Sequence, residues 1–467
     1  MLNRLALVSH TASRNSLAMD KINELAKQKA KRFGLALSTR LEEVKAFHFP
    51  NDKPKEIITV LHQATQRLNQ KLKHQNDIKE MNNLANLFIL FCEYLSYFEH
   101  TTTEETPRSI IYLIELIKCQ LQSDKFIIAG PQYKYDYSVT SLNDIKVNIE
   151  RHLYDEPGTL ENLFPKIFDD MYIVNFPKIE RDNILNHVII GHELGHAIAD
   201  EFLNNESNKK TYTQTLNKIK TNLSEHLNQE NEPEINLEIF TKTREMRNRG
   251  LQEILSDIVC TLIFGPSALF CLFDVIVIGK GDPNRPAHLN YDYYPPAKFR
   301  IRKIYNLLKD KGMIQALHSL KNEGNNDTIN NALSHLDHIE CFINDETDIK
   351  NIKTEAITKL SYDWLESTLE EAINFIEQKI QSTPINATLI TKQTTELVAR
   401  LQNGLPPNEI GNYPTIEIPD WRIAILAGWL VNLSDDPLNK FHINKLVMQA
   451  IEYIVISNSY QEHIKKS

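Results

Sequence analysis

Apolar residues recur at three- and four-residue spacing through most of the chain, which is the pattern of amphipathic helices. Leu84, Leu87 and Phe91, for example, fall on one face of a helix. The N-terminal part of the chain has four such segments: 16–33, 55–75, 78–98 and 105–123. We expect them to form a helical region over residues 1–124.

The pattern changes near residue 125, where short apolar or alternating runs favour strands. The first run is Phe126–Ile128, and Gln132–Val139 alternates after it. A third candidate, Met171–Phe176, ends at Pro177, which cannot donate to a sheet. The sequence therefore predicts a small sheet within a largely helical chain.

Helical periodicity is expected to resume near Arg181 and to return over 237–263. The polar stretch 204–236 between these segments reads as an insertion. Gly265-Pro266 then divides an apolar run into two buried helices, and residues 280–296 form a loop rich in Pro, Asn, Asp and Tyr. From residue 297 the pattern is helical again, with breaks near 323–327, 346–351 and 403–418.

The predicted fold class is therefore mainly α (α+β): a central domain with a small sheet, flanked by helical regions. We expect three regions: 1–124, 125–310 with the insertion 204–236, and 311–467. The low glycine count, 14 in 467 residues, also favours helices over turn-rich β structure.

Composition narrows the function classes. The net charge of −9 gives no general attraction to nucleic acid, so no nucleic-acid partner is expected. No apolar run is long enough for a signal sequence or a membrane span, so we expect a cytoplasmic protein with no membrane partner. The five cysteines are scattered and fit small buried residues in a reducing compartment.

The residues with most chemical information are His192-Glu193-Leu194-Gly195-His196, an H-E-x-x-H pattern. Two histidines four residues apart lie on one helix face, where both imidazoles can reach one zinc ion at about 2.0–2.1 Å. Glu193 is rotated by about 100° from His192, toward a water on the zinc. The flanking residues are apolar, and a buried helix seldom carries such side chains without a use for them.

Gly191 and Gly195 each weaken that helix by about 1 kcal/mol relative to alanine, so packing or the site must require them. We interpret Asp200 as a helix-surface or buried salt-bridge carboxylate rather than a ligand, and we do not expect His187 to be a ligand.

A catalytic zinc needs a third protein ligand and an open position. The metzincin arrangement fails because Ala199 and Phe202 stand where Gly and His are needed, and no upstream cysteine suits the deformylase arrangement. The remaining arrangement places a glutamate on a second helix, with an aspartate four residues later. Glu253 and Asp257 have that spacing. The competing glutamates, which lack such an aspartate, are Glu234, Glu238 and Glu245.

His192-Glu193-x-x-His196 with Glu253-x-x-Ser-Asp257 resembles the gluzincin metallopeptidases, the clan that includes thermolysin. The resemblance covers about 125–310 and is specific only at the two helices. It implies a zincin-like catalytic domain, with zinc held by His192, His196 and Glu253 and with two antiparallel active-site helices beside a small sheet. Asp257 would accept a hydrogen bond from a ligand histidine. The separation of His196 and Glu253 is longer than in thermolysin-like enzymes, which requires an insertion.

The attacked carbonyl develops an oxyanion, which a positioned His, Tyr or Arg commonly stabilises. The loop before Arg300 resembles a His-Pro-Pro-x-x-x-Arg element of some gluzincins, with Tyr294 in the histidine's place. The candidates there are Tyr294, His288, Tyr291 and Tyr293. The alternative is that these tyrosines pack the loop and that Arg300 pairs with a carboxylate.

The sequence thus predicts a zinc metallopeptidase that hydrolyses peptide or protein substrates through a zinc-bound water, with Glu193 as the base. Two alternatives stay open: a zinc hydrolase of a non-peptide amide, and a non-catalytic scaffold or regulatory protein with structural zinc. No nucleotide cofactor is expected. The sequence does not fix the oligomeric state.

Overall fold

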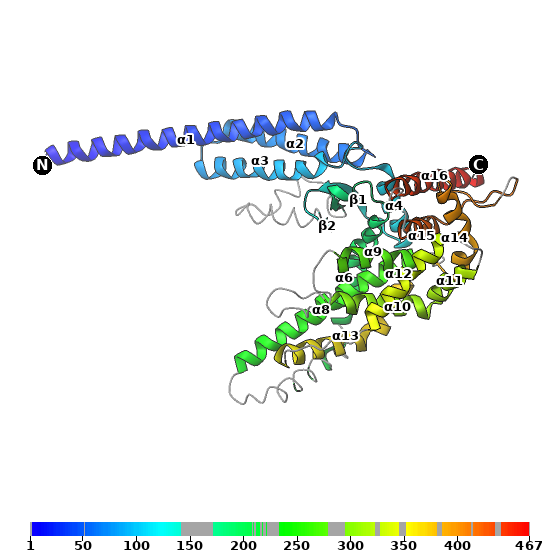
Figure 1. Cartoon of the computed structure of the whole chain (residues 1–467). Coiled ribbons are helices and arrows are strands. Elements are labelled where there is room, and N and C mark those ends of the chain that lie inside the picture. The colour runs from blue at the N-terminus through cyan, green and yellow to red at the C-terminus, as the bar shows by residue number, and fades with distance from the viewer. Residues whose placement is uncertain are drawn as a thin grey trace. The chain divides into compact units, whose positions relative to one another are not determined.

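The computed structural model shows a mainly helical protein with one small sheet (Figure 1). It describes residues 2–50, 52–141, 171–207, 209, 212–214, 217, 221, 233–278, 295–322, 327–344, 352–380, 385–411, 414–434 and 440–466. The fold class predicted from the sequence is confirmed. Contacts divide the chain into two compact units: unit 1 is Met1–Ile111 with Lys125–Arg181, and unit 2 is Tyr112–Asp124 with Asp182–Ser467.

Unit 1 combines long helices with the sheet. Its helices are α1 (Leu2–Lys45), α2 (Lys53–His74) and α3 (Ile78–Glu99), followed by α4 (Arg108–Gln120), whose residues from Tyr112 on belong to unit 2. α1, α2 and α3 pack side by side in Figure 1. Their apolar faces form one core, which includes Phe88 and Phe91 of α3 and also Ile128 and Ile173 from the sheet. The amphipathic spacing of these segments is therefore the reason for the packing.

The first and third predicted strands are present, but the second prediction, Gln132–Val139, was largely wrong: only Ser138 and Val139 of that run lie in the second strand. The strands are β1 (Phe126–Gln132), β2 (Ser138–Ser141) and β3 (Met171–Pro177). β3 lies in the centre, parallel to β1 and antiparallel to β2. Its register places Met171 beside Phe126 of β1, and Tyr172 beside Ser141 of β2.

Two predictions about local structure were wrong. No α-helix begins near Arg181, because the chain forms two 3₁₀ turns, η2 (Lys178–Glu180) and η3 (Asn186–Ile189), before α6 starts at Ile190. Three of the five cysteines are not buried, since they lie on the outer faces of helices. The exposed ones are Cys92, Cys119 and Cys341, whereas Cys260 and Cys271 are buried as expected.

Unit 2 is built mainly from helices. The helices that follow the sheet are α6 (Ile190–Ser207), α8 (Pro233–Phe264), α9 (Pro266–Leu272), the π-helix η4 (Phe273–Ile278) and α10 (Ala297–Asp310). The remaining elements are α11 (Met313–Ser319), η5 (Leu320–Asn322), α12 (Asp327–Asn344), α13 (Ile352–Lys379), α14 (Ala387–Gln402), α15 (Trp421–Asn432) and α16 (Lys440–Lys466). α6, α13 and α10 all contact α8.

The predicted break at Gly265-Pro266 is confirmed, and its cause is visible. Gly265 has φ +59°, a conformation that a side chain rarely adopts, and it ends α8. Pro266 begins α9, where its fixed φ suits a first helical position. Both helices are buried beside the break. Within the described ranges, no helix combines the length and the apolar character that a membrane span requires.

The insertion 204–236 lies partly outside the described residues. α6 continues through its start to Ser207, and α8 begins inside its end, at Pro233. The contact division places the sheet in unit 1 and both helices that carry the candidate site in unit 2. The division of the chain into regions 1–124, 125–310 and 311–467 stays a prediction.

Candidate metal centre

Two helices of unit 2, α6 and α8, bring the candidate metal ligands together. Contacts along the pair follow one register: Gly191 with Phe264, Gly195 with Ser256, Asp200 with Gln252, and Glu206 with Arg247. Residue numbers rise along α6 as they fall along α8, so the helices run antiparallel. Residues spaced by one turn lie on the same face of their helix, and on each helix this face is turned toward the other helix.

The two glycines of the motif explain why these helices come so close. A Cβ at Gly195 would lie 3.0 Å from Val259 Cβ and 3.1 Å from Ser256 Cα. A Cβ at Gly191 would lie 2.8 Å from the ring of Phe264. All three distances are shorter than ordinary carbon contacts of about 3.5–4.0 Å, so α8 packs directly against the backbone of α6. The close packing of the two helices therefore explains why glycine is present at these positions, despite its low helix propensity.

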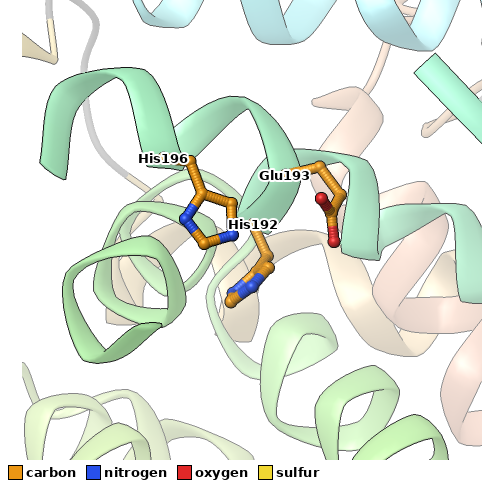
Figure 2. Close-up of side chains that lie close together, drawn as sticks. All are labelled: His192, Glu193 and His196. Atoms are coloured by element: carbon orange, nitrogen blue, oxygen red, sulfur yellow. The ribbon is translucent and has the colours of Figure 1, made fainter. Parts of the chain in front are cut away.

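His192, Glu193 and His196 gather at this contact (Figure 2). Each offers one nitrogen or oxygen atom, and these atoms lie within 4.8 Å of one another. Figure 2 shows the two imidazoles next to each other, with the Glu193 carboxylate to one side of them. His192 is buried, whereas Glu193 and His196 are partly exposed. A cluster of metal-binding residue types is therefore present.

Glu253, from α8, faces both histidines. Its Oε2 lies 3.4 Å from His192 Nε2, and its Oε1 lies 3.9 Å from His196 Nε2. Two ligands of a tetrahedral zinc with bonds of about 2.0–2.1 Å are separated by about 3.3 Å. Each imidazole nitrogen thus lies close to, or about half an ångström beyond, that spacing from one oxygen of the carboxylate. The donor set of two imidazoles and one carboxylate also suits zinc.

The competing glutamates are not brought to this place by the described part of the chain. Glu245 lies on α8 two turns before Glu253 and is exposed. The side chains of Glu234 and Glu238 lie outside the described residues. Asp200 accepts a hydrogen bond of 2.5 Å from Gln252, as a surface carboxylate would. His187 is buried in η3, before α6 begins.

Asp257 and Arg300 form the inner wall of the site. Asp257 Oδ1 lies 2.8 Å from His192 Nδ1, although this contact is off the line of the ring N–H bond. Arg300, at the start of α10, donates from Nε and Nη2 to the two oxygens of Asp257, each over 2.8 Å. Its Nη1 also lies 3.3 Å from Glu253 Oε2. A bidentate guanidinium therefore holds both carboxylates in place.

The buried charges of this cluster balance in the metal-free protein. Burial alone would lower the pKa of His192, but the Asp257 and Glu253 carboxylates outweigh it and raise that pKa to about 10. Burial also opposes the charge on both carboxylates, but Arg300 and His192 lower the pKa of each to about 2. Two buried anions thus face two cations, which meets the requirement that buried charges be paired.

His196 differs from His192. Burial, followed by the neighbouring His192 charge, lowers its pKa to about 4, so its imidazole is neutral near pH 7. Its Nδ1 lies 3.0 Å from the hydroxyl of Ser256, and its Nε2 points toward Glu253. Both histidines thus engage Nδ1 with α8 and direct Nε2 to the same place.

The sequence reasoning missed the role of Ser256. It lies in the quoted Glu253-x-x-Ser-Asp257 run, but nothing in the run shows that its hydroxyl reaches the other helix. For Arg300 the sequence offers a carboxylate partner as one alternative, and the structure confirms such a partner in Asp257. The oxyanion candidates Tyr294, His288, Tyr291 and Tyr293 all lie outside the described residues.

Comparisons with known proteins add no family to this picture: no family model, curated protein or solved structure matches the chain. What the structure shows is the His-Glu-x-x-His group at a possible metal site.

Proposed function

We propose that this chain is a zinc-dependent metallopeptidase whose metal is held by His192, His196 and Glu253. The observation that carries the proposal is the convergence of both Nε2 atoms on one carboxylate, at 3.4 and 3.9 Å. Two imidazoles and a glutamate, with a fourth position left for water, form a known catalytic zinc set.

Glu253 is a better third ligand than Glu193. Glu253 is largely buried and oriented by Arg300, so its oxygens are fixed beside both imidazoles. Glu193 lies next to His192 on α6 and is partly exposed, and its carboxylate stands to one side of the rings in Figure 2. This leaves Glu193 to act as a base. A structural zinc site is closed by four protein ligands and has no need for a base.

Zinc, when bound, lowers the pKa of a coordinated water toward about 7 and polarises a carbonyl group. Glu193 takes the proton from the attacking water and delivers it to the leaving amine. Arg300 is engaged with Asp257 and Glu253, so it is not the donor to the oxyanion. That role stays with the loop candidates Tyr294 and His288, and with Tyr291 and Tyr293.

The peptide as substrate rests on the resemblance to gluzincins, and the site geometry fits the hydrolysis of any amide. Zinc-loaded protein should therefore be assayed with three probes: fluorescein-labelled casein, a mixture of fluorogenic peptides, and small acyl amides. Cleavage of casein or peptides supports the peptidase. Cleavage of the small amides alone would replace it with a hydrolase of non-peptide amides.

The matched variant is Glu193→Gln, which keeps the shape of the side chain and removes the base. General bases contribute about 10²- to 10⁴-fold to the rate, so kcat should fall by at least about 100-fold. The zinc content should stay at the wild-type level. If wild-type protein with a full zinc content cleaves none of the three probes, the proposal is wrong. A non-catalytic scaffold protein with bound zinc then replaces it.

A further inference from the structure

The hydroxyl of Ser256 stands between the backbone of its own helix and a candidate ligand on the other. Its Oγ lies 2.9 Å from the carbonyl oxygen of Gln252, four residues earlier in α8. The same Oγ lies 3.0 Å from His196 Nδ1. Ser256 is fully buried, so no water competes for either contact.

One hydroxyl proton has to serve these two contacts. A carbonyl oxygen can only accept, so the contact with Gln252 uses the proton of Ser256. The oxygen of Ser256 then presents a lone pair to His196, and the imidazole must donate from Nδ1. A neutral imidazole carries one proton, so His196 Nε2 is left with its lone pair, directed toward Glu253.

The placement of Ser256 depends on the close contact of the two helices. Gly195 precedes His196 in α6, and a Cβ there would lie 3.1 Å from Ser256 Cα and 3.2 Å from its carbonyl oxygen. Without glycine at this position α8 could not approach so closely. The serine hydroxyl is short, and it reaches the imidazole only because the backbones nearly touch.

The neighbouring polar residue of α8 does not fill this role. Gln252 lies one turn before Ser256, and its side chain could in principle hold a histidine of α6. It donates instead to Asp200, over 2.5 Å. Asp257, the next residue of α8, is engaged with His192 and Arg300. Among the described residues, Ser256 is therefore the side chain that orients His196.

We infer that Ser256 is a positioning residue that holds His196 in the Nδ1–H tautomer and so makes Nε2 available to a metal. The inference rests on the proposed function, since it names how one ligand of that site is prepared. Ser256 does not touch the metal or the substrate. Hydrogen bonds from ligand histidines to such partners commonly change metal affinity by about 10- to 100-fold when removed.

The test is a spectroscopic reading of the tautomer in metal-free protein labelled with ¹⁵N-histidine. Two-bond and three-bond correlations between ring protons and ring nitrogens distinguish a protonated Nδ1 from a protonated Nε2. The signals of His196 are assigned by their loss in His196→Gln. The variant is Ser256→Ala, and the matched control is Ser361→Ala, another buried serine whose hydroxyl bonds a backbone carbonyl, that of Thr243.

We expect His196 of the wild type and of Ser361→Ala to carry its proton on Nδ1. In Ser256→Ala the pattern should move to mixed tautomers or to a protonated Nε2. A protonated Nε2 in the wild type, or an unchanged pattern in Ser256→Ala, would overturn the inference.

Zinc affinity, measured by competition with a chromogenic chelator, gives the second readout. It should fall by about 10- to 100-fold in Ser256→Ala and stay near wild type in Ser361→Ala. An unchanged affinity in Ser256→Ala would also overturn the inference. Zinc binding with the expected tautomer but without hydrolysis would instead count against the proposed function alone.

Discussion

The two histidines of the site sit in contrasting surroundings, although they come from consecutive turns of α6. His192 lies on the inner side, buried against the charged pair of Asp257 and Arg300. His196 lies on the outer side, partly exposed, and its partner is the neutral hydroxyl of Ser256. The inner side is organised by buried charge, and the outer side by close packing and one hydrogen bond.

The two histidines of one short motif are therefore held in place by two different kinds of interaction. A buried ion pair contributes little to net stability, yet it becomes costly when one partner is removed. Substitutions on the inner side should therefore lower both the free energy of unfolding and the affinity for metal. On the outer side, removal of the Ser256 hydroxyl leaves no buried charge unpaired. Substitutions there should therefore lower mainly the affinity for metal.

The largest effect is expected from Arg300→Leu on the inner side. The change leaves the buried carboxylates of Asp257 and Glu253 without their guanidinium. Breaking a buried pair in this way costs about 3–5 kcal/mol in the free energy of unfolding. Denaturant unfolding of the metal-free protein measures the loss. Lys303→Leu, on the same helix as Arg300, removes a more exposed ion pair with Glu366 of α13 and should cost no more than about 1 kcal/mol. Equal losses in the two variants would contradict the account.

Asp257→Asn tests the inner side by metal affinity. The amide keeps the shape of the side chain but removes the charge beside His192. The dissociation constant for zinc should rise by about 100-fold, the upper end of the range for partners of ligand histidines. Competition titration measures it beside Ser256→Ala, whose smaller effect should lie lower in the same range. A larger effect from Ser256→Ala would reverse the comparison.

Gly195→Ala tests the packing on which the outer side depends. Alanine gains about 1 kcal/mol of helix propensity, but its Cβ would meet Val259 and the backbone of Ser256. Overpacking of this kind costs about 1–3 kcal/mol, so we expect a net loss of up to about 2 kcal/mol in thermal or denaturant unfolding.

The control for that variant is Gly191→Ala, which meets the ring of Phe264 instead. Both variants should be destabilised, but only Gly195→Ala should alter the ¹⁵N tautomer signals of His196. A normal tautomer pattern in Gly195→Ala would separate the helix contact from the orientation of the histidine.

The smallest effect is expected from Gln252→Ala. Its amide bonds Asp200 and does not contact either imidazole. Stability should change by no more than about 1 kcal/mol, which is typical of one hydrogen bond near the surface. Zinc affinity should stay within about twofold of wild type in the same titration. A tenfold weakening would mean that Gln252 also orients a ligand.

Much of the fold could be predicted from the sequence because it follows from local periodicity. The helices near 55–75 and 78–98 differ from α2 and α3 by no more than two residues at each end. The start of α6 could not be predicted, because the apolar residues before Ile190 are buried in 3₁₀ turns rather than in a helix. These residues are apolar because they are buried, and not because they belong to an amphipathic helix.

In the candidate site, too, the residues set by local spacing could be predicted, and those set by contacts between helices could not. His192, Glu193 and His196 are visible as a motif because their spacing within one helix determines the shared face. Glu253 was found through its spacing from Asp257. Ser256 and Arg300 depend on the register between helices and on the entry of α10, which no local pattern contains.

The central claim is that His192, His196 and Glu253 share one metal ion. Zinc-edge X-ray absorption of protein loaded with one equivalent of zinc tests it most directly, with Glu253→Gln and Glu245→Gln as paired variants. The account predicts two imidazole nitrogens and a carboxylate oxygen around zinc in the wild type and in Glu245→Gln, and loss of zinc or of that oxygen in Glu253→Gln. A zinc environment unchanged by Glu253→Gln, or one without two imidazoles, would contradict it.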